Sequence, residues 1–343
     1  MAGSLQHVAI ASGVEWAESV HQSITSFFFN SGVDRVLSIG GQPTTFRGTN
    51  YSSNYTNGSS TNLWNVEENQ IPFDAVDIRD SGFDLVSIYV TDVDTEEQLA
   101  SIDDFLVVHP NAKFLLKDFV TYDTDYSVAT GGSNRTAKIA DFVAIVAAFK
   151  SRPEVVGFAF ANENNLAANR EDGTSEADWY SLVDAALEAG KAEDDSGLGR
   201  FYATIDADLG TYPGDDALPN LDVLGLNIYR GTTFTDLGDD IAAATSKPTF
   251  LSEFGRQRDD NTNQEQQDQA DEVVDLIKEA EGLYPYISFW VHFKFTHIRT
   301  TQTGDDLWES AAPLAEGTNQ TRDKYLLYGA IKDFLTENEY GAG

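Results

Sequence analysis

The chain has 343 residues, of which 41% are hydrophobic and 12% aromatic, a content of bulky apolar side chains that indicates a globular protein rather than a disordered one. Acidic residues outnumber basic ones by 56 to 22, and the formal charge of -34 disfavours binding to nucleic acid or to anionic membranes and favours neutral or cationic ligands. The chain has no cysteine, which excludes disulfides, thiolate nucleophiles and thiolate-bound metals.

The negative charge also predicts a response to salt. Charges of one sign repel each other in the folded state, and concentrated salt screens them because the Debye length falls to about 3 Å at 1 M. Adaptation to a saline habitat is one hypothesis, and simple solubility is the other.

No stretch approaches the run of about 18 apolar residues that a membrane helix needs, so we expect no membrane insertion. The N-terminal residues show no basic region followed by an apolar run, as a signal peptide would. We expect a soluble protein, either secreted with its signal peptide already removed or cytoplasmic. The sequence leaves the oligomeric state open.

The first 44 residues precede a repeating pattern. The pattern at residues 15–29 predicts a helix or an extended apolar segment. An apolar run that ends at Gly40-Gly41 follows, and it favours a short hairpin across the bottom of a barrel. We assign residues 1–44 to an N-terminal cover and hairpin, about 45–335 to a barrel, and the whole chain to one domain.

Eight short apolar or β-branched segments then follow, at residues 45–51, 85–91, 113–120, 155–161, 201–205, 223–229, 249–252 and 286–293. Most are separated by helix-length stretches with apolar residues every three or four positions, at 95–108, 137–149, 177–192, 234–245 and 263–281. Buried parallel strands alternating with helices eight times predict an α/β fold, the (β/α)8 TIM barrel. Residues 207–221 include Pro213, Gly214 and Pro219, so we expect the fifth helix to be degenerate.

Two glutamates end strands of this predicted barrel. The fourth segment runs into Asn162-Glu163 and the seventh into Glu253. Active sites of such barrels form at the carboxyl ends of the strands, so both carboxylates are expected to face one cavity. A glutamate at a strand end is more often solvated or ion-paired. However, the separation of 90 residues (253 minus 163), close to three strand–helix units, favours a common site.

A pair of carboxyl groups is what cleavage of a glycosidic bond requires, because one protonates the leaving oxygen and the other acts at the anomeric carbon. Glu163 lies beside Phe158, Phe160 and the barrel wall, so desolvation is expected to keep it protonated as the general acid/base. Glu253 is expected to act as the nucleophile if hydroxyls or cations donate to it. Strands four and seven lie on opposite sides of a barrel, which is consistent with carboxyl groups about 5 to 5.5 Å apart, the retaining geometry.

Several motifs besides the glutamates are similar to those of a known family. They are Phe46-Arg-Gly-Thr-Asn-Tyr-Ser, Leu221-Asp-Val-Leu-Gly-Leu-Asn-Ile-Tyr-Arg-Gly, Leu251-Ser-Glu-Phe-Gly and Ile287-Ser-Phe-Trp. Over roughly residues 40–295 the chain resembles the retaining (β/α)8 glycosidases that carry the acid/base after strand four and the nucleophile after strand seven. Within that superfamily it most resembles fungal β-1,3-glucanosyltransferases and related β-glucan-active enzymes.

The resemblance implies roles for further residues. Asn162 would hydrogen-bond the 2-hydroxyl of the sugar at the cleaved bond, and Tyr229 would orient Glu253. Trp290 would stack on a sugar face, with a core tryptophan as the alternative. Further candidates for sugar subsites, each with packing as the alternative, are Asn227, Tyr89 and Tyr122.

One part of the family pattern is missing. The transferases carry an arginine in strand two, where this chain has Ser87 or Ile88. The sequence does not choose among the cations that could replace it, which are Arg47, Arg230, Arg256 and Lys117. Without a replacement Glu253 would lose a charge-assisted partner, and activity would suffer.

The sequence therefore predicts a retaining glycoside hydrolase acting on a β-linked polysaccharide or oligosaccharide, a β-glucan or a mannan. A β-glucan transglycosidase and a barrel that binds glycans without cleaving them are the alternatives. No cofactor is predicted, because no Gly-X-Gly-X-X-Gly follows a strand. No metal is predicted either: the five histidines form no His-X-His pair at a strand end, and Asp206-X-Asp208 is expected to be solvated.

Overall fold

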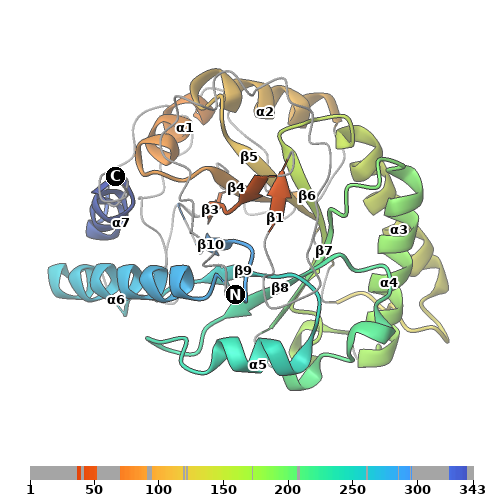
Figure 1. Ribbon diagram of the computed structural model, residues 1–343. Helices are drawn as coiled ribbons and strands as arrows, with labels where there is room; N and C mark the ends of the chain where they lie inside the picture. Colours follow the sequence, from red (N-terminus) through yellow and green to blue (C-terminus); the bar gives the residue numbers. More distant parts are fainter. Residues whose placement is uncertain are drawn as a thin grey trace, which may run out of the picture.

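The computed structural model describes residues 37–39, 42–51, 70–90, 95–118, 120, 123–171, 173–206, 209–259, 262–284, 286–293, 295 and 324–337. Within these residues, eight parallel strands form a closed barrel in the order β10-β3-β4-β5-β6-β7-β8-β9. Figure 1 looks down this barrel and shows the helices on its outside. The predicted TIM barrel is confirmed.

Each predicted strand contains or overlaps a strand of the barrel. Their bounds are β3 Arg47–Asn50, β4 Leu85–Val90, β5 Lys113–Asp118, β6 Val155–Asn162, β7 Phe201–Asp206, β8 Val223–Ile228, β9 Thr249–Phe254 and β10 Trp290–His292. Both faces of these strands are covered, which explains why they read as continuous apolar runs. The predicted hairpin is also present: β1 (Leu37–Ile39) pairs antiparallel with β2 (Gln42–Thr44), which leads into the amino end of β3.

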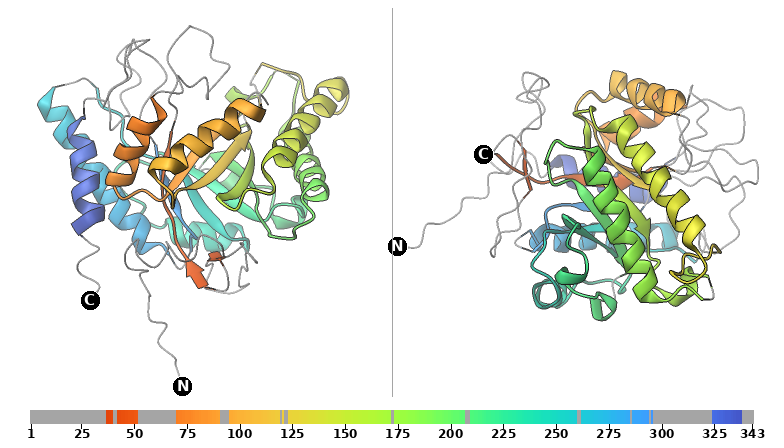
Figure 2. Two further views of the ribbon diagram at one scale, coloured as in Figure 1. Left: turned by 90° about the horizontal axis from the view of Figure 1, so that it is seen from above. Right: turned by 90° about the vertical axis from the view of Figure 1, so that its right-hand side faces the viewer.

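The helices follow the strands along the chain, and their apolar faces pack on the barrel. Their bounds are α1 Ile71–Asp80, α2 Thr95–Val108, α3 Gly132–Phe149, α4 Glu176–Glu193, α5 Leu237–Ala244, α6 Asn263–Gly282 and α7 Leu326–Glu337. The helix α4 begins with a capping box between Ser175 and Asp178, and Thr262 caps α6. The five predicted helices are confirmed, and the two views in Figure 2 show them packed around the strands.

The fifth strand–helix unit is irregular, as predicted. Within the described part of the segment between β7 and β8, only two 3-10 turns occur, η3 (Leu209–Thr211) and η4 (Asp215–Ala217). Pro213 separates them, and proline cannot donate the backbone hydrogen bond that a continuous helix would need there.

The inside of the barrel is filled by apolar side chains near the amino ends of the strands. The rings of Phe250 and Phe289 stack with their centroids 4.5 Å apart, and Tyr202 lies against both. Two glycines make room for these rings: a Cβ on Gly157 would come within 2.3 Å of Tyr202, and one on Gly225 within 2.7 Å of Phe250. This apolar plug closes one end of the barrel, so polar inward-facing residues gather at the carboxyl end.

Candidate active site

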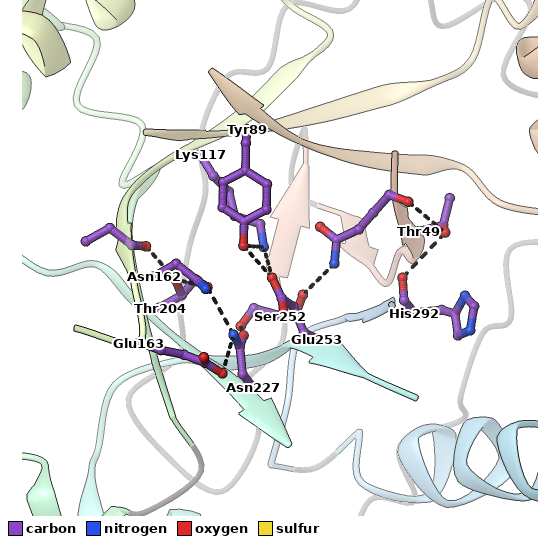
Figure 3. A network of polar contacts seen from close by, with 12 residues as sticks. Thr49, Tyr89, Lys117, Asn162, Glu163, Thr204, Asn227, Ser252, Glu253 and His292 are labelled. Carbon is purple, nitrogen blue, oxygen red and sulfur yellow. Dashed lines mark hydrogen bonds and ion pairs between the residues drawn. The ribbon is translucent and has the colours of Figure 1, made fainter. Parts of the chain in front are cut away.

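Polar side chains from several strands meet at the carboxyl end of the barrel (Figure 3). The residues that make the network around the two predicted catalytic glutamates are Tyr89, Lys117, Asn162, Glu163, Thr204, Asn227, Tyr229, Ser252 and Glu253. They come from β4, β5, β6, β7, β8 and β9 or the residues that directly follow these strands.

Glu253 lies in β9 and is only 5% exposed. Lys117 Nζ donates to its Oε1 at 2.9 Å, and the Tyr89 hydroxyl donates to the same oxygen at 2.5 Å. The Tyr229 hydroxyl donates to Oε2 at 3.2 Å. Burial, followed by the charge of Glu253, raises the pKa of Tyr229 well above its usual value, so this hydroxyl keeps the proton that it donates. One ammonium and two hydroxyls therefore hold both carboxylate oxygens.

Lys117, which lies on the neighbouring strand β5, is one of the four cations that the sequence offered for Glu253, and it contacts that glutamate. Its side chain is fully buried, and its Nζ lies 3.2 Å from the Tyr89 hydroxyl and 4.5 Å from the ring centroid of that tyrosine. The other candidate cations pair with remote carboxylates: Arg47 with Glu281, Arg230 with Asp240, and Arg256 with Glu265 and Glu272.

Glu163 directly follows β6 and is less buried than Glu253. Burial raises its pKa to about 6, with a further increase from the charge of Glu253, whereas the hydrogen bond from Asn227 lowers it. Because Asn227 Nδ2 donates to Glu163 Oε1 at 2.9 Å, the carboxyl group is held in place while its other oxygen stays available. A carboxyl group with this pKa can both give and take a proton near neutral pH.

The two asparagines of the site, Asn162 and Asn227, differ in their exposure to solvent. The side chain of Asn227 is fully buried, donates to Asn162 Oδ1 at 3.0 Å and accepts from Ser252 Oγ at 2.5 Å. The prediction of Asn227 as a sugar-binding residue is therefore wrong, because its amide is enclosed and bridges Glu163 to β9. Asn162 keeps 7% of its surface exposed. Its Oδ1 accepts from Asn227 and Thr204, and no hydrogen bond of its Nδ2 occurs among the described residues.

Strand irregularities let neighbouring residues face the same cavity. In a regular strand Asn162 and Glu163 would point to opposite faces, but the register between β6 and β7 shifts between Phe160 and Asn162. Ala161 and Glu163 have positive φ angles of 71° and 54°, which are unusual for residues other than glycine. A second shift, between β8 and β9, brings Ser252 and Glu253 into the same network. Backbone strain of this kind often marks functional sites.

Trp290 does not line the site, so the prediction that it stacks on a sugar is wrong. It is fully buried and packs edge-on against Phe83 and Phe254, between the barrel and its helices. Because alternate residues of β10 face opposite ways, Val291 points into the barrel, and Phe293 continues along that inner side. Phe293 makes an edge contact with Tyr229, with centroids 6.2 Å apart.

The other residues singled out by the sequence are Tyr89, Tyr122 and Asp206. Tyr89, predicted to bind substrate, gives its hydroxyl to Glu253, although its ring stays partly exposed. Tyr122 lies outside the described residues. Asp206, which the sequence suggested only as a solvated residue, ends β7 next to the site and raises the pKa of Glu163 through its charge.

Two other properties of the described residues concern metal binding and membranes. Across the described ranges, no group of three or more His, Cys, Asp or Glu side chains is arranged to hold a metal ion. None of the helices in that part of the chain is long and apolar enough to cross a membrane.

Solved structures share the architecture of this chain at low sequence identity. The β-glucuronidase of Parabacteroides merdae with glycerol in its active site matches with a TM-score of 0.66 and 11% identity, covering 88% of this chain and 39% of that one. The β-D-glucuronidase of Dictyoglomus thermophilum matches with a TM-score of 0.61 and 14% identity, covering 89% and 53%. A GH5_18 variant from Streptomyces cattleya in complex with Manβ1-4GlcNAc matches with a TM-score of 0.61 and 13% identity, covering 86% and 81%.

This chain has the (β/α)8 fold of these glycoside hydrolases. It spans only about two fifths of the length of the Parabacteroides enzyme, so the likeness concerns the barrel alone. No protein-family model matches the chain, and no curated protein matches it in sequence.

Proposed function

We propose that the protein is a retaining glycoside hydrolase that acts on β-linked oligosaccharides or polysaccharides, with Glu163 as acid/base and Glu253 as nucleophile. The observation that carries the proposal is the contrast between the two carboxyl groups in one hydrogen-bonded network. Lys117 and two tyrosines donate to Glu253, whereas the pKa of Glu163 is raised to about 6. Environments that differ in this way mark the separate roles of acid and nucleophile.

In the first step, Glu163 gives its proton to the leaving glycosidic oxygen while a carboxylate oxygen of Glu253 attacks the anomeric carbon. The bond to the leaving sugar breaks, and a glycosyl ester of Glu253 forms. In the second step, ionised Glu163 takes a proton from water, whose oxygen attacks the same carbon and releases Glu253. In this proposal Asn162 donates to a sugar hydroxyl, and the hydrogen bond from Asn227 keeps Glu163 at the leaving oxygen.

Lys117 also bears on the alternative of a barrel that binds glycans without cleaving them. That alternative rested on the missing cation for Glu253, and Lys117 supplies one at 2.9 Å. Whether a β-glucan or a mannan is the substrate, and whether water or a second sugar accepts the glycosyl group, depends on the loops above the site. Product analysis on both polysaccharides distinguishes hydrolysis from transfer.

The test of the function is turnover itself. The protein is incubated with β-1,3-glucan, β-1,4-glucan, mannan and xylan, and new reducing ends, transfer products and the first-released anomer are followed. We expect cleavage of at least one substrate with retention at the anomeric carbon. Binding without any product from any of the four would overturn the proposal in favour of a glycan-binding barrel.

A further inference from the structure

The main chain around Glu163 has an unusual conformation that brings its carboxyl group to the cavity. Ala161 and Glu163 have φ angles of 71° and 54°, in the left-handed region that residues with a side chain rarely adopt. Asn162 lies between them, and the register of β6 and β7 shifts at this point. Because such a conformation is costly, it persists only where surrounding contacts hold it. The contacts that hold this segment therefore also hold Glu163 in place.

An arginine closes the loop that follows Glu163. Arg170 Nη1 donates to the main-chain oxygen of Asn164 at 2.9 Å and also to that of Asn165. These two acceptor residues directly follow Glu163 in the chain, and both are buried. A charged guanidinium forms stronger hydrogen bonds to oxygen than a neutral donor does. One side chain therefore joins the two ends of residues 164–170.

Two asparagines of the same loop connect it to the acid/base residue. Asn169 Nδ2 donates to the main-chain oxygen of Glu163 at 3.2 Å, and Asn164 Nδ2 donates to the main-chain oxygen of Asn169 at 2.8 Å. The main-chain nitrogen of Leu166 also donates to the Glu163 oxygen, at 3.0 Å. Together with the bonds of Arg170, these contacts form an unbroken path from the guanidinium to the main chain of Glu163.

The carboxyl group and the main chain of Glu163 are held by different residues. Asn227 Nδ2 donates to the carboxyl Oε1 at 2.9 Å, whereas the Nη1 of Arg170 donates to main-chain oxygens of the loop. The loop is also fixed to β7, because Asn165 Oδ1 accepts from the main-chain nitrogen of Asp206 at 3.0 Å. Arg170 therefore acts on Glu163 through the main chain, with β7 as the fixed side.

We propose that Arg170 is a positioning residue for acid catalysis, which keeps the carboxyl group of Glu163 at the leaving glycosidic oxygen by closing the loop of residues 164–170. This inference rests on the proposed glycosidase function and adds a residue to its first step. Glu163 can give its proton only while its carboxyl group lies within hydrogen-bond reach of the leaving oxygen. A small displacement of its main chain therefore harms acid catalysis more than it harms attack by Glu253.

The experiment measures kcat/KM of Arg170→Met on two aryl β-glycosides, one with a good leaving group and one with a poor one. This constant reports the first step, in which the poor leaving group depends on the proton from Glu163 and the good one hardly does. Asn169→Ala is a second variant, because it removes a donor to the Glu163 oxygen and retains the guanidinium.

A matched control removes the same kind of contact elsewhere. Arg135 Nη1 also donates to two main-chain oxygens, that of Tyr126 at 3.0 Å and that of Asp178 at 2.8 Å. Its side chain, like that of Arg170, is partly exposed. Arg135→Met therefore removes the same charge and the same type of bond outside the loop that follows Glu163. Circular dichroism and thermal unfolding verify that each variant is folded.

We expect Arg170→Met to lower kcat/KM about 10–100-fold for the poor leaving group and less than about threefold for the good one. Asn169→Ala should show the same split with a smaller loss, and Arg135→Met should change both constants by less than about threefold. A folded Arg170→Met variant that loses equally on both substrates, or on neither, would overturn the proposal. If Arg170→Met does not fold, Asn169→Ala decides by the same criterion.

A titration separates this inference from the proposed function. Burial raises the pKa of Glu163 to about 6, so a loosened loop that admits water to the carboxyl group should lower it. NMR of carbon-13-labelled glutamate follows this pKa without turnover, and the Glu163 signal is the one missing in Glu163→Gln. If the wild type cleaves no glycoside, the glycosidase assignment fails, but a pKa that falls in Arg170→Met and not in Arg135→Met still shows that Arg170 positions Glu163. An unchanged pKa in Arg170→Met contradicts that role even if the enzyme is active.

Discussion

The contact between Lys117 and Glu253 yields the most quantitative prediction, because Lys117→Met removes the charge and keeps much of the side-chain volume. The two groups lie 2.9 Å apart, with side-chain exposures of 0% and 6%, so water cannot replace the ammonium. Removing one partner of a buried ion pair costs about 3–5 kcal/mol, because the remaining charge is left uncompensated. Glu253 can avoid part of this cost by taking up a proton, but a protonated carboxyl group cannot act as the nucleophile.

We therefore expect Lys117→Met to lower kcat/KM about 10²–10³-fold, similar to the loss of a preorganised donor in other active sites. The assay uses an aryl β-glycoside with a good leaving group, so that acid catalysis by Glu163 contributes little. Tyr89→Phe removes a hydroxyl that donates to a carboxylate but removes no charge, and it should cost about 10–100-fold.

A matched control shows whether the loss of any cation has this effect. Arg230→Met removes a cation that pairs with the exposed Asp240, and it should change kcat/KM by less than about threefold. Circular dichroism and thermal unfolding verify that each variant is folded. A folded Lys117→Met variant that keeps more than about a third of the wild-type kcat/KM would refute the role of Lys117, since leaving one buried charge unpaired costs far more than a threefold change represents.

The pH profile, two aromatic residues and the salt response give three further predictions. Because Glu163 must be protonated to act as acid and its pKa is about 6, kcat/KM on poor leaving groups should fall as the pH rises through about 6. Asn227→Ala removes a hydrogen bond that lowers this pKa, so that limb of the pH profile should move to higher pH; an unmoved limb would argue against Glu163 as the titrating group. Phe293→Ala should raise KM, whereas Trp290→Ala should cost about 3–5 kcal/mol of stability and leave KM nearly unchanged, as kinetics and denaturant unfolding will show. The thermal unfolding midpoint should rise from low to molar salt, because salt screens the repulsion within a chain of formal charge -34, and a constant midpoint would favour simple solubility.

The strands and the glutamates could be predicted because they depend on strong local signals. Parallel strands covered on both faces must be apolar throughout, so segments such as Val155–Asn162 stand out from the polar loops around them. A polar residue at the end of such a strand is equally conspicuous, as Glu163 and Glu253 illustrate. Tertiary structure then supplies what the sequence does not show, the contact of Glu253 with a lysine 136 positions away.

The errors came from the direction in which side chains point. Trp290 lies within the eighth apolar segment, but alternation turns it outward and brings Phe293 to the network instead. The same alternation could have singled out Lys117, since a lysine two residues after the inward-facing Leu115 must lie inside the barrel. The register shift at Ala161 could not be predicted, because no glycine or proline signals it.

The central claim is that Glu253 attacks the anomeric carbon, and chemical rescue tests it most directly. Glu253→Ala should abolish turnover of an activated aryl β-glycoside, and added azide should partly restore it by attacking from the vacated side. The rescued product of a retaining enzyme is then the glycosyl azide of inverted, α configuration. As a control, Glu163→Ala should mainly impair substrates with poor leaving groups. A folded Glu253→Ala variant that turns over substrate without azide would contradict the account.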